Sequence, residues 1–98
     1  MTNAMRPIHP GEILRDELEE LDFSATAFAK KLKIPTNRVT SILNEQRSVT
    51  VDTALRLACF FGNTPEFWMN LQMVYDIKTS MHKSWKKIRK QIELHKAA

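Results

Sequence analysis

The segment between residues 24 and 43 constrains this chain most, because it reads as two short helices with a sharp break between them. Ser24 is a good N-cap for the first helix. Three apolar residues then follow at the spacing of one buried helical stripe: Phe28, Ala29 and Leu32. Pro35 disfavours helical geometry at the residue before it but suits the first turn of a new helix. We therefore expect one helix to end just before Pro35 and a second to begin there.

The second helix has an inner and an outer side. Val39 and Ile42 are its predicted buried residues. Its outer side is polar and partly cationic, and carries Thr36, Asn37, Arg38, Thr40 and Ser41. Two short helices joined by a three-residue break, the second with such an outer side, indicate a helix-turn-helix. The alternative is an ordinary pair of packed helices.

Nucleic-acid binding is the chemistry that these residue types favour. Asparagine can form two hydrogen bonds with adenine, and arginine can do the same with guanine or bind a phosphate. Arg47, in the connector after the second helix of this pair, is placed to neutralise the charge of the DNA backbone. The amide end of the helix that follows Ser24 can bind a phosphate. The predicted DNA-binding set is Ala25, Thr26, Thr36, Asn37, Arg38, Thr40, Ser41 and Arg47.

The remaining periodicity predicts an all-α fold with five helices in residues 6–77. One helix is expected over residues 10–21, before the pair described above. A fourth is expected between the N-cap Thr50 and the stop signal Gly62, and a fifth from Thr64-Pro65 onward.

Residues 78–98 are predicted to form an additional basic amphipathic helix or tail. Seven Lys and Arg residues against one Glu give this segment a charge of +6, whereas the whole chain carries +4. The lysines form either a solvated surface or an arm that binds phosphates. We expect the apolar side to pack on the body of the domain; it consists of Met81, Trp85, Ile88 and Ile92. Residues 1–5 are expected to be a disordered start or a cloning scar.

Composition limits the function classes. At 98 residues the chain is one domain, and no apolar run approaches the roughly 18 residues of a membrane span. With one cysteine, Cys59, in an apolar run, and no secretory signal, we expect a cytoplasmic protein with a buried thiol. No Cys/His cluster, glycine-rich phosphate loop or paired nucleophile and base occurs, so we expect no metal, no cofactor and no enzymatic activity.

Two further surfaces are candidates for protein binding. The fifth helix carries more apolar surface than a monomer of this size readily covers, so we expect a homodimer. Its predicted interface is Phe67, Trp68, Leu71 and Tyr75. The helix expected over residues 10–21 has an acidic outer side, which is either a solubilising surface or a docking site for a basic protein. The candidate docking residues are Asp16, Glu17 and Glu20.

Several motifs together resemble a known family. They are His9-Pro10-Gly11-Glu12-Ile13-Leu14, Arg47-Ser48-Val49-Thr50, Ala54-Leu55-Arg56-Leu57-Ala58, Pro65-Glu66-Phe67-Trp68 and Asn70-Leu71-Gln72. With them, residues 6–77 resemble the HigA-type antitoxins, also called VapI-like or plasmid-maintenance antidote proteins, within the Xre/Cro-type (lambda-repressor-like) helix-turn-helix group. Two positions depart from the usual pattern, because Lys33 and Glu45 stand where glycine is common.

The resemblance implies the antitoxin of a type II toxin–antitoxin module. Such a protein would bind its own operator DNA as a dimer, repress its own operon and neutralise a small basic HigB-like mRNA endonuclease. Any ribonuclease active site would then lie on the partner protein. The alternative is a solitary Xre-type transcriptional regulator that has the same fold and no toxin partner.

Overall fold

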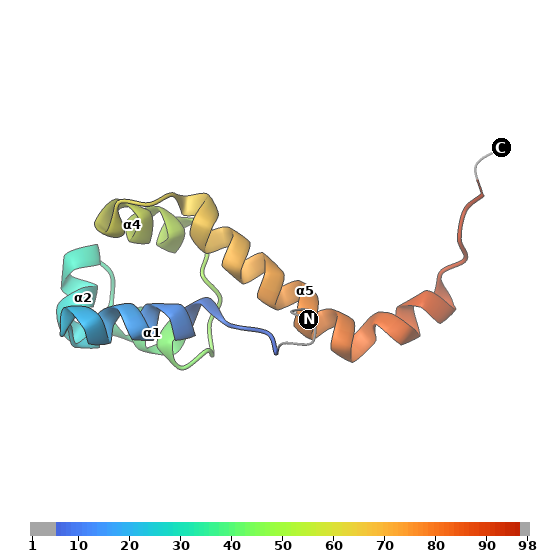
Figure 1. Cartoon of the computed structure of the whole chain (residues 1–98), viewed down its shortest axis with the longest axis horizontal. Helices are drawn as coiled ribbons and strands as arrows, with labels where there is room; N and C mark the ends of the chain where they lie inside the picture. The colour runs from blue at the N-terminus through green and yellow to red at the C-terminus, as the bar shows by residue number, and fades with distance from the viewer. Residues whose placement is uncertain (1–5, 97–98) are drawn as a thin grey trace.

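The computed structural model describes residues 6–96 and contains five helices, which Figure 1 shows. They are α1 (Pro10–Leu21), α2 (Ala25–Leu32), α3 (Thr36–Leu43), α4 (Val51–Phe61) and α5 (Pro65–Gln91). No strand occurs among the residues described. The predicted all-α architecture is therefore confirmed, while the expectation for residues 1–5 lies outside the described part of the chain.

Side chains cap the beginnings of four helices by accepting hydrogen bonds from backbone amides of the first turn. The capping residues are His9, Ser24, Thr50 and Thr64. His9 differs from the others, because a ring nitrogen, Nδ1, accepts from the amide of Gly11 at 2.9 Å. Pro35 was expected in the first turn of α3. It is instead the N-cap of α3, and Thr36 is the first helical residue.

The turns between helices contain left-handed backbone. The φ angle is 61° at Lys33 and 63° at Glu45, the two positions named above as departures from the expected family pattern. Asp22 and Gly62 end α1 and α4 with φ angles of 58° and 73°. A residue other than glycine costs roughly 1 kcal/mol in this conformation. Packing of the helices must offset that cost at three of these four turns.

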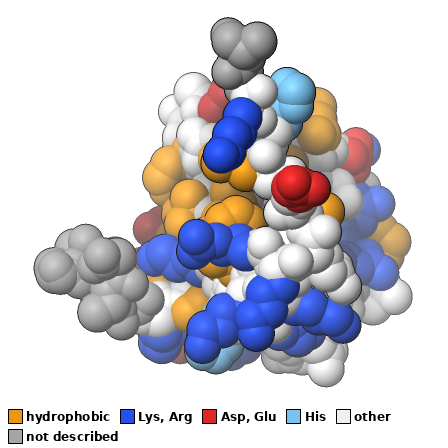
Figure 2. Space-filling model, turned by 90° about the vertical axis from the view of Figure 1, so that its right-hand side faces the viewer, with side chains coloured by type: hydrophobic (Ala, Val, Ile, Leu, Met, Phe, Trp, Pro, Cys, Tyr) orange, Lys and Arg blue, Asp and Glu red, His pale blue; other side chains and the backbone are white. Residues whose placement is uncertain are grey.

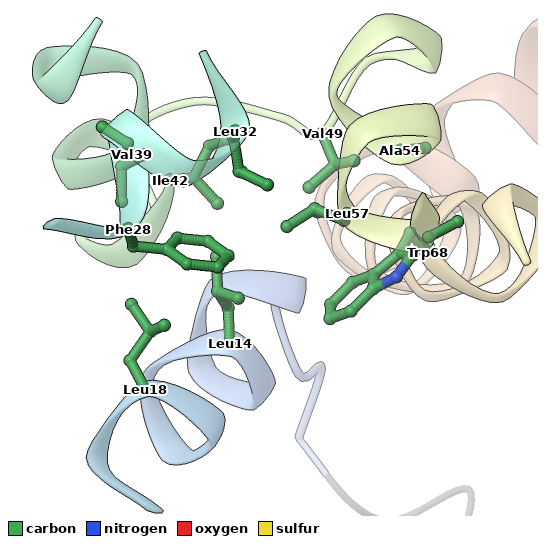
Figure 3. Packing of buried hydrophobic residues seen from close by; sticks show 12 residues of the cluster. Leu14, Leu18, Phe28, Leu32, Val39, Ile42, Val49, Ala54, Leu57 and Trp68 are labelled. Carbon is green, nitrogen blue, oxygen red and sulfur yellow. The ribbon is translucent and has the colours of Figure 1, made fainter. Parts of the chain in front are cut away.

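One apolar core holds the helices together (Figure 3). Phe28 and Ala29 of α2 are at most 1% exposed, and Val39 and Ile42 of α3 are 1% exposed each, as predicted for its inner side. The other helices contribute Leu14 and Leu18 from α1, Ala54, Leu57 and Ala58 from α4, and Trp68 from α5. This packing fixes α3 with its polar side outward.

Two residues lie elsewhere than predicted. Trp68 is 1% exposed, and its indole Nε1 donates to Asn63 Oδ1 at 3.0 Å, whereas the preceding Phe67 is 44% exposed. Consecutive residues face different sides of a helix, and here the tryptophan faces the core. The assignment of Trp68 to a dimer interface is therefore wrong. Cys59 is exposed rather than buried, because it follows Ala58, which occupies the inner side of α4.

The additional C-terminal helix is the second half of α5, which runs for 27 residues without interruption. Neither glycine nor proline occurs between Tyr75 and Gln91 to break it. Figure 1 shows this half extending beyond the body of the protein. Its apolar side is 44–67% exposed at Met81, Trp85, Ile88 and Ile92. The expectation that this side packs on the body is therefore wrong.

Candidate nucleic-acid interface

The outer side of α3 carries the five polar residues predicted for it. Asn37 is exposed, and the other four are half-buried: Thr36, Arg38, Thr40 and Ser41. The hydroxyl of Thr40 donates to the carbonyl oxygen of Asn37 at 3.2 Å, so it must rotate before it can donate to a phosphate. The structure thus brings these residues together on one helix, and their contact with DNA stays a prediction.

Two arginines outside the predicted DNA-binding set hold its helices in place. Arg15 of α1 donates through Nη2 to the carbonyl oxygen of Leu43, the last residue of α3, at 2.8 Å. Arg56 of α4 donates through Nη1 to the carbonyl oxygen of Leu32, the last residue of α2, at 2.9 Å. Cations at these helix ends satisfy free carbonyl groups and complement the helix dipole. One signal was available: Arg15 is the one cation in an otherwise acidic first helix.

Arg38 is held by an ion pair with the beginning of α4. Its Nη1 lies 2.8 Å from Asp52 Oδ2, and the same oxygen accepts from Arg56 Nε at 3.0 Å. Hydrogen bonds from the two guanidinium groups, that of Arg38 first, hold the pKa of Asp52 below its ordinary value. Asp52 is therefore ionised at neutral pH, and Arg38 faces solvent from a defined position.

An open hollow of about 520 Å³ lies beside this ion pair, between α3 and the beginning of α4. It is lined by Arg38, Arg47, Ser48, Thr50, Asp52 and Thr53. Two arginines of the predicted DNA-binding set thus face one space, next to the amide end of a helix, and both features attract anions. Ala25 and Thr26 occupy the first turn of α2 and do not line this hollow.

The connector that carries Arg47 is anchored on α5. Gln72 is buried, its Oε1 accepts from the amide of Val49 at 2.8 Å, and its Nε2 donates to Asp76 at 2.9 Å. The buried ring of His9 packs edge-on against Tyr75, with 4.8 Å between ring centroids. Burial lowers the pKa of His9, so the neutral ring that caps α1 is favoured. Gln72 of α5 therefore positions the connector beside α3, and Tyr75 of α5 packs on the residue that caps α1.

The acidic residues of α1 form a separate surface. Asp16, Glu17 and Glu20 are all exposed, as expected for a solvated or docking surface. Glu17 also lines a small hollow of about 180 Å³ together with Ile13, Phe61, Asn63, Phe67 and Trp68. A carboxylate beside the partly exposed rings of Phe61 and Phe67 offers both charge and apolar area to a protein partner. Its use for that purpose stays a prediction.

An exposed polar second helix, packed on a short first helix and flanked by arginines, defines a helix-turn-helix DNA-binding protein. Within residues 6–96, no group of three residues is arranged to hold a metal ion. Among the helices of residues 6–96, none combines the length and the hydrophobicity of a membrane span.

Comparison with known proteins agrees with this class. The helix-turn-helix family model matches residues 14–68. An addiction module antidote protein of a HigA family from Coxiella burnetii is 65% identical, with a TM-score of 0.89 over 93% of this chain and 100% of that chain. Antitoxin HigA of Pseudomonas aeruginosa, with the higBA promoter, is 47% identical, with a TM-score of 0.87 over 90% of this chain and 97% of that chain. Virulence-associated protein I of Dichelobacter nodosus is 49% identical over 77 residues, which are 78% of this chain and 71% of that protein.

The chain therefore belongs to the HigA family of antitoxins within the helix-turn-helix proteins. This is a family of DNA-binding proteins rather than of enzymes. The predicted family resemblance is confirmed.

Proposed function

We propose that this chain is the antitoxin of a type II toxin–antitoxin module, in which it binds the operator of its own operon as a dimer and neutralises a HigB-like mRNA endonuclease. The observation that carries operator binding is the outward polar side of α3 beside the arginine-lined hollow. The solved P. aeruginosa relative with promoter DNA supports the same role. Base edges would be read by Asn37 and Arg38, and phosphates would be held by Arg47 and the hydroxyl groups.

Replacing Asn37 or Arg38 by alanine tests this reading directly. Each substitution should weaken operator binding by about 1–3 kcal/mol and leave the thermal midpoint nearly unchanged, because neither side chain belongs to the core. Fluorescence anisotropy with operator and scrambled DNA measures the effect. Arg6→Ala is the matched control, since it removes the same charge and a similar ion pair, with Glu12 at 2.7 Å, at an arginine outside the predicted DNA-binding set. A variant at position 37 or 38 that binds operator like the wild type would remove that residue from the reading set.

The proposed dimer places a second copy of the chain on the exposed apolar side of α5. Phe67, Leu71 and Val74 of α5 line a groove of about 340 Å³ together with Ile8, Ile13, Asn70 and Lys78. Met81, Trp85 and Ile88 repeat these steps of four and three residues, beginning seven positions after Val74, which is the pattern of a helix–helix seam. A two-fold dimer buries the same surface on both copies. It would present two α3 helices one DNA turn apart, roughly 34 Å, to an inverted repeat.

Cations also cover the projecting half of α5. Figure 2 views the protein from the side toward which α5 projects, and Lys and Arg side chains gather over the lower part of this face. Four lysines of this half are exposed: Lys83, Lys86, Lys87 and Lys90. Their charge can add a sequence-independent attraction to DNA in the dimer, because each neutralised phosphate releases counterions.

The acidic side of α1 is the proposed toxin contact, since its charge is opposite to that of a protein that binds RNA. Reversing Glu17 and Glu20 to lysine together should slow association with the toxin by about tenfold or more at low salt, and should leave operator affinity nearly unchanged. Stopped-flow mixing with the product of the neighbouring gene measures the rate.

Glu93→Lys is the control for this experiment, because it reverses a charge beyond the end of α5. An unaltered association rate at low salt would exclude this side of α1 as the contact. Failure of the chain to bind any neighbouring gene product, or to rescue growth, would instead favour a solitary regulator.

A further inference from the structure

One carboxylate connects the three helices of the DNA-binding region. Asp52 Oδ2 accepts from Arg38 Nη1 of α3 at 2.8 Å and from Arg56 Nε of α4 at 3.0 Å. Arg56 in turn donates to the carbonyl oxygen of Leu32 at the end of α2, at 2.9 Å. Arg56 thus holds Asp52 in place, and the backbone of Leu32 holds Arg56. Through Asp52, Arg38 therefore has a fixed position relative to α2 and α4.

Stability alone does not account for this arrangement. The side chains of Asp52, Arg56 and Arg38 are 56%, 39% and 28% exposed, and ion pairs that reach solvent stabilise proteins little. A negative charge beside the arginines is also unfavourable for DNA binding in general, because it repels phosphates. The geometry has a different consequence: it restricts the rotamers of Arg38 before DNA arrives. A guanidinium group has five N–H donors, and the bond to Asp52 uses one of them. The others remain able to donate to a guanine.

We propose that Asp52 is a positioning residue that sets operator specificity through Arg38. The inference rests on the proposed operator binding. Ordering Arg38 in advance lowers the entropy cost of reading a base, whereas the charge of Asp52 weakens binding to every DNA sequence alike. Only the first effect changes specificity, because a charge that weakens binding to every sequence alike leaves the ratio of the affinities for operator and scrambled DNA unchanged.

The test measures the ratio of affinities for operator and scrambled DNA of equal length at one salt concentration. Asp52→Ala should lower this ratio by about 3- to 10-fold, which corresponds to the cost of ordering one long side chain. Asp52→Glu, which keeps the charge, should recover part of the ratio. In the Arg38→Ala background, Asp52→Ala should leave the ratio unchanged, because the residue through which Asp52 acts is absent.

Glu45→Gln is the matched control, since it removes a negative charge just after α3 at a residue outside the ion pair with Arg38. It should raise affinity for both DNAs and keep their ratio. An unchanged ratio in Asp52→Ala, or an equal fall in the Arg38→Ala background, would overturn the role of Asp52. A wild-type protein that does not distinguish the two DNAs would refute operator reading itself, and with it this role.

Discussion

Replacing Trp68 by alanine is expected to lower the free energy of unfolding by about 3–5 kcal/mol, because a large core side chain leaves a cavity and its hydrogen bond is lost. The indole is 1% exposed, packs at 5.6 Å between ring centroids against Phe61, and donates to Asn63. Urea unfolding followed by circular dichroism measures the change.

Phe67→Ala is the control for this prediction, because it removes an aromatic ring at the adjacent, exposed position. It should change monomer stability much less and should weaken dimerisation, which sedimentation at micromolar concentration detects. Equal losses of stability in the two variants would contradict the division between core and interface. A dimer unaffected by Phe67→Ala would remove that residue from the proposed interface.

Replacing Gly11 by alanine is expected to destabilise the protein by about 3 kcal/mol or more, because the new methyl group would overlap a rigid part of the backbone. A Cβ atom at this position would meet the carbonyl oxygen of Ile42. This contact is between α1 and the inner side of α3, so α3 must shift and operator affinity should fall as well. Thermal unfolding and DNA titration measure the two effects.

Gly62→Ala is the matched control, since it substitutes the other glycine of the chain. Its φ angle is 73°, and nothing lies within 4 Å of the added Cβ. The expected loss is only about 1 kcal/mol, from the left-handed backbone, with operator affinity retained. If Gly11→Ala were as mild as Gly62→Ala, close seating of α3 on α1 would not limit the fold.

Local sequence signals predicted most of the fold, because helix caps and stops act within a few residues. Ser24, Thr50 and Gly62 mark helix boundaries where their chemistry requires them. The continuity of α5 was not predicted, since residues 78–98 were expected to form a separate helix or tail, although neither glycine nor proline separates the two halves. Which of two adjacent aromatic residues faces the core was not readable, because Phe67 and Trp68 both fit a broad apolar side.

The helix that carries the candidate site could be predicted from the sequence, whereas the contacts that hold this helix in place could not. Arg38 and Asn37 follow from the outer side of one helix, which periodicity identifies. The ion pair of Arg38 with Asp52, and the bond from Arg56 to Leu32, join residues 14 and 24 positions apart on different helices. Such contacts depend on how the helices cross, and the spacing of apolar residues contains no direct signal for them. The same holds for Gln72, whose bond to Val49 spans 23 positions.

Footprinting of the DNA upstream of its own gene tests the central claim most directly. If the chain is a dimeric operator-binding antitoxin, the wild-type protein should protect two half-sites of an inverted repeat, with centres about one helical turn apart, roughly 34 Å. The Asn37→Ala/Arg38→Ala double variant should lose this protection at the same concentration. Protection that is absent, or no stronger than on scrambled DNA, would contradict the claim.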